Sequence, residues 1–132
     1  MAHLPLYTAL TAAIIMMFQM GLMMTVGLRR GKYEQSLGDG GHDDLLMLIR
    51  RHGNLTENAP IFITVLALLE MMSGGSMLIL SLGLGFVGVR IAHAVGLTLG
   101  GPNPFRIVGA FGTLLLGFGS AVYLLYNVTQ AL

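Results

Sequence analysis

The chain has 132 residues, of which 55% are hydrophobic and only 10% are charged. Soluble domains carry about 25% charged residues, so this composition is typical of an integral membrane protein. The absence of cysteine excludes disulfides, thiolate metal sites and cysteine nucleophiles, and a formal net charge of +1 provides no basic patch for binding nucleic acid.

Four apolar segments are each long enough to form a helix across a hydrocarbon core, which takes about 20 residues. The expected helices cover about residues 4–28, 43–72, 77–99 and 106–131, in a single domain spanning 1–132. The first segment is a poor secretory signal, because it lacks a positively charged start and exceeds the roughly 7–15 apolar residues of such signals. The sequence therefore predicts an all-α, membrane-embedded bundle of four helices that run up, down, up and down.

The connections between these helices have the composition of turns. Residues 38–41 read Gly-Asp-Gly-Gly, and Asp43 is expected to be the N-cap of the second helix. Residues 73–76 read Ser-Gly-Gly-Ser and are short enough to make the second and third helices a tight antiparallel hairpin. Residues 100–104 read Gly-Gly-Pro-Asn-Pro, and proline both ends the third helix and starts the fourth, because it lacks a backbone N–H and fixes φ.

All seven lysine and arginine residues fall on one side of this topology. They follow the first helix, begin the second, lie toward the end of the third and begin the fourth. The positive-inside rule therefore places the first and third connections in the cytoplasm and both termini outside it. These residues are Arg29, Arg30, Lys32, Arg50, Arg51, Arg90 and Arg106.

The most unusual feature is the stretch 50–60, RRHGNLTENAP, which lies at the head of a long apolar run. Arg50, Asn54 and Glu57 are spaced i, i+4 and i+7, so they share one helical face. Such groups cost several kcal/mol in a bilayer unless they meet partners or a polar ligand. A cation, an amide and a carboxylate on one stripe are typical of a surface that binds a zwitterionic, multiply charged small molecule.

Arg90 and His93 extend this polar set from the third helix. Counted from the hairpin at 73–76, Arg90 and Glu57 lie at a similar depth, so an internal Arg90–Glu57 ion pair is one interpretation and contact with a ligand is the other. His93 lies one turn beyond Arg90 on the same face. Two roles remain possible for it: packing inside the bundle, or contact with a substrate. Because four short helices cannot easily enclose a polar cleft, we expect the site to be completed between subunits.

Three further patterns receive structural interpretations. Glu70, near the outer end of the second helix, is interpreted as a snorkelling or capping residue rather than a proton-transfer group. The methionines of the first helix are interpreted as apolar packing rather than copper ligands, because no His or Cys accompanies them at ligand spacing, so no metal is expected. Small residues recur every four positions on the third and fourth helices and allow close approach, within the chain or between subunits. These ladders are Gly88, Ala92, Gly96 and Gly100, and Gly109, Thr113, Gly117 and Ala121.

The sequence IRRHGNLTENAPIF at 49–62 resembles the signature of the MAPEG superfamily, the membrane-associated proteins in eicosanoid and glutathione metabolism. The four helices, the turn at 38–41 and the remaining polar positions also fit, most closely with the small bacterial branch. The resemblance implies a homotrimer in a bilayer, here a bacterial inner membrane, with glutathione bound between adjacent subunits near the cytoplasmic side. It implies that glutathione contacts Arg50, Asn54, Glu57, Arg90 and His93, and that Arg106 is the catalytic residue that stabilises the thiolate.

The resemblance favours a membrane glutathione transferase or glutathione-dependent peroxidase that acts on hydrophobic electrophiles from the bilayer. The alternative is a non-catalytic lipid-binding scaffold or accessory membrane protein of the same fold. Two departures bear on this choice: Asn58 and Leu97 stand where several of the enzymes carry tyrosine. A transporter is disfavoured, because the sequence has neither internal repeats nor broken helices.

Overall fold

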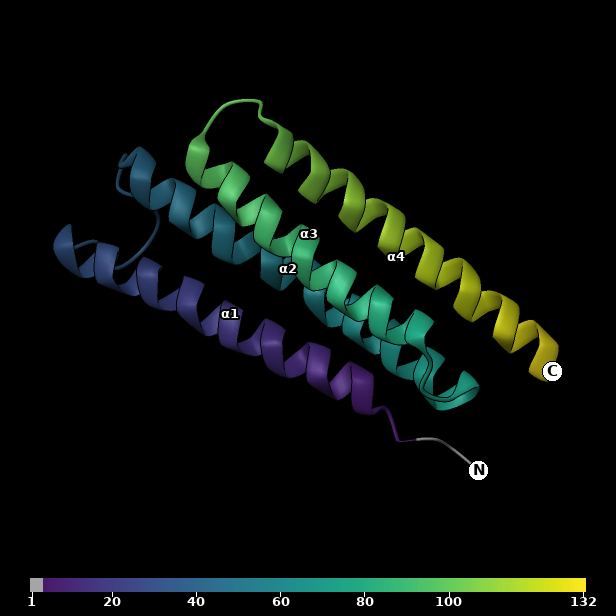
Figure 1. Ribbon diagram of the computed structural model, residues 1–132. Coiled ribbons are helices and arrows are strands. Elements are labelled where there is room, and N and C mark those ends of the chain that lie inside the picture. Colours follow the sequence, from purple (N-terminus) through teal and green to yellow (C-terminus); the bar gives the residue numbers. More distant parts are fainter. Residues whose placement is uncertain (1–3) are drawn as a thin grey trace.

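The computed structural model describes residues 4–132, which form four long helices (Figure 1). These are α1 (Leu6–Lys32), α2 (Asp43–Ser73), α3 (Met77–Leu99) and α4 (Pro104–Ala131). They run side by side in alternating directions, so that the N- and C-terminal parts of the chain lie at the same end of the bundle. Each helix is long and apolar enough to cross a membrane, and residues 4–132 contain no strand. The prediction of an all-α membrane bundle of four helices is confirmed; the first three residues of the predicted domain 1–132 lie outside the described part.

Two helices are longer than the sequence predicted. α1 continues to Lys32 instead of ending near residue 28, and its last turn is basic. A membrane helix can project beyond the hydrocarbon, and cations in the last turn interact favourably with the helix dipole. α4 begins at Pro104 rather than at residue 106, because proline is well suited to the first turn of a helix, where no N–H partner is needed. Asn103 caps this helix by accepting a hydrogen bond from the backbone N–H of Arg106 at 3.0 Å.

The start of α2 corrects one prediction. His42, in an extended conformation, occupies the N-cap position, and Asp43 is the first helical residue. Asp43 and Asp44 therefore lie in the first turn, where their negative charges interact favourably with the helix dipole, and Asp44 Oδ1 accepts a hydrogen bond from the backbone N–H of Leu45 at 2.8 Å.

The turns at both ends of the bundle depend on glycine. Gly38, Gly40 and Gly41 have φ values of 66°, 60° and 80°, which L-amino acids with side chains rarely adopt. In the hairpin between α2 and α3, Gly74 has φ 81°, and the Ser76 hydroxyl oxygen accepts a hydrogen bond from the backbone N–H of Ile79 at 3.3 Å. The predicted glycine turn and tight hairpin are confirmed.

The apolar core lies mainly along α2 and α3. At its centre the rings of Phe62 and Phe86 stack with centroids 3.9 Å apart. α4, by contrast, buries only Gly109 and Ser120 within residues 4–132. Leu116, Tyr123 and Leu124 pack against the core, but most large apolar side chains of α4, like the methionines of α1, are exposed, so these two helices present apolar faces to lipid or to another subunit.

Glycines allow α3 and α4 to approach closely. A Cβ atom at Gly109 would lie 2.4 Å from the Cβ of His93, and one at Gly96 would lie 2.4 Å from the backbone nitrogen of Arg106. By contrast, a Cβ atom at Gly88 or Gly117 would have nothing within 4 Å. The small-residue ladders are therefore divided: Gly96 and Gly109 serve packing within the chain, whereas Gly88 and Gly117 face open space.

A buried carboxylate ties α1 to α2. Glu70 is 1% exposed and accepts hydrogen bonds from the backbone N–H groups of Tyr7 at 2.9 Å and Thr8 at 2.7 Å, and from the Thr8 hydroxyl at 2.7 Å. Pro5, at the N-cap of α1, makes no side-chain capping hydrogen bond. Glu70 thus caps α1 from the neighbouring helix, which confirms the capping interpretation.

Candidate functional site

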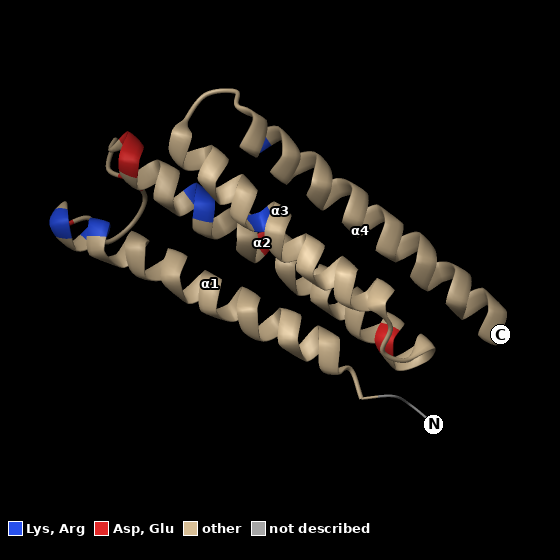
Figure 2. Ribbon diagram, viewed as in Figure 1, with Lys and Arg blue, Asp and Glu red and all other residues tan. Residues whose placement is uncertain are grey.

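Basic residues are concentrated at one end of the bundle. Figure 2 shows the lysines and arginines in the half nearer the connections between α1 and α2 and between α3 and α4. We call the end that carries residues 33–42 and 100–103 the basic end. The predicted site residues lie in this half, on α2, α3 and the start of α4.

A buried guanidinium joins three helices. Arg90 of α3 is 3% exposed; its Nη1 donates to the Thr113 hydroxyl of α4 at 2.9 Å, and its Nη2 donates to the Asn54 side-chain oxygen of α2. Its Nε has no hydrogen-bond partner within residues 4–132. We call Asn54, Arg90 and Thr113 the Arg90 centre. Its hydrogen-bond partners are neutral, so the guanidinium inside the bundle is solvated by an amide and a hydroxyl and forms no ion pair within residues 4–132.

The ion pair considered between Arg90 and Glu57 is not formed, which corrects that interpretation. The ion pairs of residues 4–132 are Arg29–Asp44 and Arg50–Glu57. Glu57 has Arg50 as its partner, with 3.7 Å between Oε1 and Nη1, and both side chains are more than half exposed. Asn54 lies between Arg50 and Glu57 on the same face of α2. Its side-chain oxygen accepts a hydrogen bond from Arg90, so the buried guanidinium has an amide and not a carboxylate as its partner on α2.

The contact with Arg90 also orients the Asn54 amide. A guanidinium only donates hydrogen bonds, so the oxygen of Asn54 must point toward Arg90. The amide nitrogen is then left as a donor for another group. The Asn58 side chain, one turn later, donates to the backbone oxygen of Asn54 at 2.7 Å. Arg90 therefore fixes a hydrogen-bond donor between Arg50 and Glu57 on the polar face of α2.

His93 and Arg106 occupy different environments. His93 is 8% exposed and packs against Gly109, which favours the packing interpretation of this residue within one chain. Arg106 is exposed and lines a groove at the start of α4 with Asn103, Ile107 and Phe111. None of the other five predicted site residues lines this groove, the groove between α2 and α4 described below, or the two further grooves described within residues 4–132. One chain alone therefore does not gather the six predicted residues into a single cavity.

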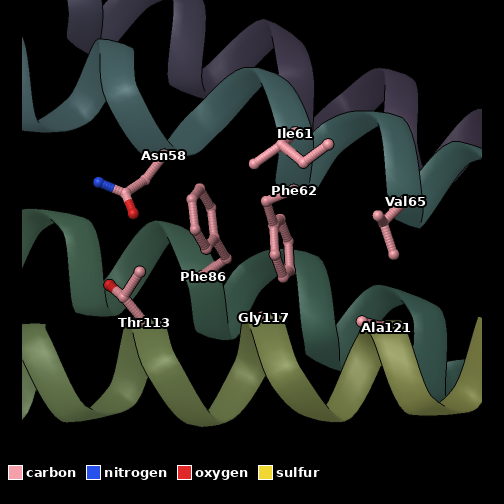
Figure 3. Close-up of a pocket in the computed structure, with 8 residues that line it drawn as sticks. All are labelled: Asn58, Ile61, Phe62, Val65, Phe86, Thr113, Gly117 and Ala121. Carbon is pink, nitrogen blue, oxygen red and sulfur yellow. The ribbon is translucent and has the colours of Figure 1, made fainter.

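An apolar groove begins next to the Arg90 centre. Figure 3 shows Asn58 and Thr113 facing each other at one end, the stacked rings of Phe62 and Phe86 in the middle, and small or aliphatic side chains beyond them. The groove measures about 200 Å³ and runs between α2 and α4. It is lined by Asn58, Ile61, Phe62, Val65, Phe86, Thr113, Gly117 and Ala121.

Two of the residues at the polar end of this groove had no site role in the sequence analysis. Thr113 was assigned to a ladder of small residues, and Asn58 was noted only as a departure from tyrosine. The one available signal for Thr113 was a hydroxyl in an apolar helix, which is more often bonded to its own backbone; Thr113 does bond the Gly109 carbonyl at 2.7 Å. Its second contact, with Arg90, depends on how α3 and α4 pack.

Comparisons with known proteins place these residues in a family context. The model of the MAPEG family matches residues 5–126. The inner membrane protein YecN of Escherichia coli K12 is 31% identical over 91 residues, which cover 69% of this chain and 66% of that protein. The YecN protein of E. coli O6:H1 matches with the same values. The alignment thus spans slightly under two thirds of these relatives, and no solved structure matches the chain.

Proposed function

The chain belongs to the MAPEG family, and on this basis we propose that it is a membrane-bound glutathione transferase or peroxidase-like protein that binds glutathione between subunits. The observation that carries the proposal is the Arg90 centre. Arg90 is held inside a membrane bundle by neutral partners, which is expensive for stability alone. The cost is explained if Arg90 presents a fixed donor and a positive potential to an anionic ligand.

The charges on α2 match those of glutathione, which carries two carboxylates and one ammonium group. Arg50 binds a carboxylate, Glu57 binds the ammonium group, and the Asn54 amide nitrogen donates to the peptide portion between them. The existing Arg50–Glu57 pair is exposed and 3.7 Å apart, so it contributes little stability and separates readily when the ligand arrives. Arg90 and His93 complete the glutathione contacts from α3.

Arg106 is the catalytic residue in this proposal. A thiol with a pKa of about 8.5 is mostly protonated at neutral pH, and a fixed cation lowers that pKa by stabilising the thiolate. The thiolate attacks an electrophilic carbon of the hydrophobic substrate, a C–S bond forms, the leaving group departs with its electron pair, and the thiol proton passes to water. Arg106 is exposed in one chain, which supports a homotrimer in which a second subunit closes the site.

The hydrophobic substrate enters from the bilayer in this proposal. The groove of Figure 3 offers an apolar path that ends at Asn58 and Thr113, beside the Arg90 centre. The basic end faces the cytoplasm of a bacterium, so glutathione arrives from that side and both termini lie outside. The concentration of cations at one end and the similarity to an inner membrane protein support this orientation and location.

Isothermal titration calorimetry of the purified protein with glutathione tests the proposal. Arg50→Gln and Glu57→Gln are each expected to weaken binding about tenfold, equal to about 1.4 kcal/mol. Arg51→Gln is the matched control, because it removes the same charge one residue away. Arg106→Gln is expected to abolish the ultraviolet absorbance of the bound thiolate while glutathione still binds. Absence of binding at millimolar glutathione contradicts the proposal.

One observation favours the alternative of a non-catalytic, lipid-binding scaffold. Arg50 and Glu57 form an ion pair within the same chain, as expected of a purely structural pair. In a scaffold, Arg50→Gln lowers the melting temperature and neither variant nor wild type binds glutathione. In a transferase, the same change leaves the unliganded melting temperature nearly unchanged, because an exposed ion pair is worth about 0–1 kcal/mol, and glutathione affinity falls.

A further inference from the structure

A second arginine at the basic end points away from the proposed glutathione site. Arg51 follows Arg50 directly, but successive residues of a helix are about 100° apart, so the two side chains leave α2 in different directions. Arg51 Nη1 donates to the hydroxyl of Thr98 on α3 at 3.0 Å. Its Nε is buried and has no hydrogen-bond partner within residues 4–132. This donor is unexplained by any contact within the described chain.

Arg51 stands at the head of an apolar groove. The groove measures about 200 Å³ and is lined from α1 by Phe18, from α2 by Arg51 and from α3 by four residues. Apart from Arg51 and Thr98, all lining side chains are apolar. We call this the Arg51 groove; its lining residues are Phe18, Arg51, Ile91, Ala94, Val95 and Thr98. It shares no residue with the groove of Figure 3.

The positive charge of Arg51 has no carboxylate partner. Neither ion pair of residues 4–132 includes Arg51. The nearest acidic residue on the same face of α2 is Asp44, two turns earlier. Its carboxylate is held by Arg29 and by the hydroxyl of Tyr33 at 2.9 Å. An anion from outside the chain is therefore the available counter-ion for Arg51.

The depth of the groove matches the boundary between lipid headgroups and acyl chains. Arg51 lies about 33 Å from the Ser73 end of α2 and Thr98 about 32 Å from the Met77 end of α3, at 1.5 Å per residue. A hydrocarbon core is about 30 Å thick, so these two polar residues lie at its boundary. Ile91 and Val95 are one to two turns deeper, in the hydrocarbon, and are each more than 40% exposed along the helix surface.

We propose that the Arg51 groove binds one anionic phospholipid. The guanidinium of Arg51 binds the phosphodiester, and one acyl chain lies along Phe18, Ile91 and Val95. A lipid with a zwitterionic headgroup leaves its ammonium without a carboxylate here, because Asp44 is already engaged. A free anion gains nothing from the apolar part of the groove. The bound lipid bridges α1 and α3 on the side of the bundle away from the α2–α4 groove.

Native mass spectrometry with defined lipids tests this proposal. Wild-type protein in mild detergent is expected to retain phosphatidylglycerol in preference to phosphatidylcholine. Arg51→Gln is expected to lower the affinity for phosphatidylglycerol at least about tenfold and to remove the preference. Arg50→Gln is the matched control, with the same loss of charge on a different face, and is expected to keep the preference. Equal effects of the two variants overturn the proposal.

A second variant tests whether an acyl chain lies in the Arg51 groove, and it provides an independent test if Arg51→Gln fails to fold. Val95→Trp keeps Arg51 and fills the groove from a partly exposed position. It is expected to lower phosphatidylglycerol retention at least about tenfold, and unchanged retention overturns the proposal. Inorganic phosphate is the headgroup probe: if it displaces phosphatidylglycerol at equal concentration, the site recognises an anion only and the lipid assignment is wrong. None of these outcomes depends on glutathione binding.

Discussion

Removal of the Glu70 carboxylate is expected to detach the start of α1 from α2. Glu70 accepts three hydrogen bonds, two of them from the backbone N–H groups of Tyr7 and Thr8. Glu70→Ala leaves a buried donor at Thr8 and a partly buried donor at Tyr7 without an acceptor; each unsatisfied buried group costs about 1–3 kcal/mol, so we expect a loss of about 3–5 kcal/mol with the Thr8 hydroxyl contact included. Glu70→Gln keeps one acceptor oxygen but loses the charge, and is expected to cost about 1–2 kcal/mol.

Equilibrium unfolding in detergent micelles measures these free energies. Thr8→Val is the matched control, because it removes only the hydroxyl donor and keeps the backbone N–H and the side-chain shape; we expect a loss of about 1 kcal/mol. In the double variant, Thr8→Val is expected to add little once Glu70→Ala is present, because the two residues share one network. The capping role is refuted if Glu70→Ala costs no more than Thr8→Val.

Three further changes probe the packing of α3 and α4 and the buried charge. Gly109→Ala brings a Cβ atom within 2.4 Å of His93 and is expected to cost at least about 2 kcal/mol of unfolding free energy, whereas Gly117→Ala, with nothing within 4 Å, is expected to be neutral or stabilising. Asn103→Ala removes the cap of α4 and is expected to lower stability by about 1 kcal/mol, measured by thermal melting. Arg90→Met is expected to reduce glutathione affinity at least about tenfold and stability by less, measured by calorimetry and unfolding in parallel; a larger loss of stability than of binding favours the scaffold.

The sequence was sufficient for the architecture. Apolar runs of membrane-spanning length and turns rich in glycine and proline predicted four helices and their order, because these signals are local. The residues that end helices were harder to predict. Asp43 has the side chain of an N-cap, yet it is the first residue of the helix, and His42 occupies the N-cap position. The reach of α1 to Lys32 depends on how far a helix continues past the bilayer, which composition does not specify.

The contacts within the site were not predictable to the same degree. The helical spacing of Arg50, Asn54 and Glu57 correctly indicated one polar face, and depth counting correctly placed Arg90 near it. Depth does not specify which of two nearby acceptors is chosen, so the pairing of Arg90 with Asn54 instead of Glu57 became apparent only from the packing of the helices. The partner hydroxyl of Thr113 comes from a third helix, whose rotation no sequence spacing determines.

Arg50, Arg51 and Arg90, the arginines of α2 and α3, lie in three different electrostatic environments. Arg50 is exposed and paired with Glu57, so its charge costs little and the pair contributes little stability. Arg51 has a hydroxyl and no carboxylate, which leaves it dependent on an anion at the bilayer boundary. Arg90 is buried among neutral groups, the most costly of the three arrangements. An amide and a hydroxyl solvate a guanidinium without an ion pair, and in the proposed function Arg90 attracts an anionic ligand through Asn54. A structure built for stability alone would place a carboxylate or an apolar side chain there, and for this reason Arg90 distinguishes a ligand-binding protein from a scaffold more sharply than the exposed pair does.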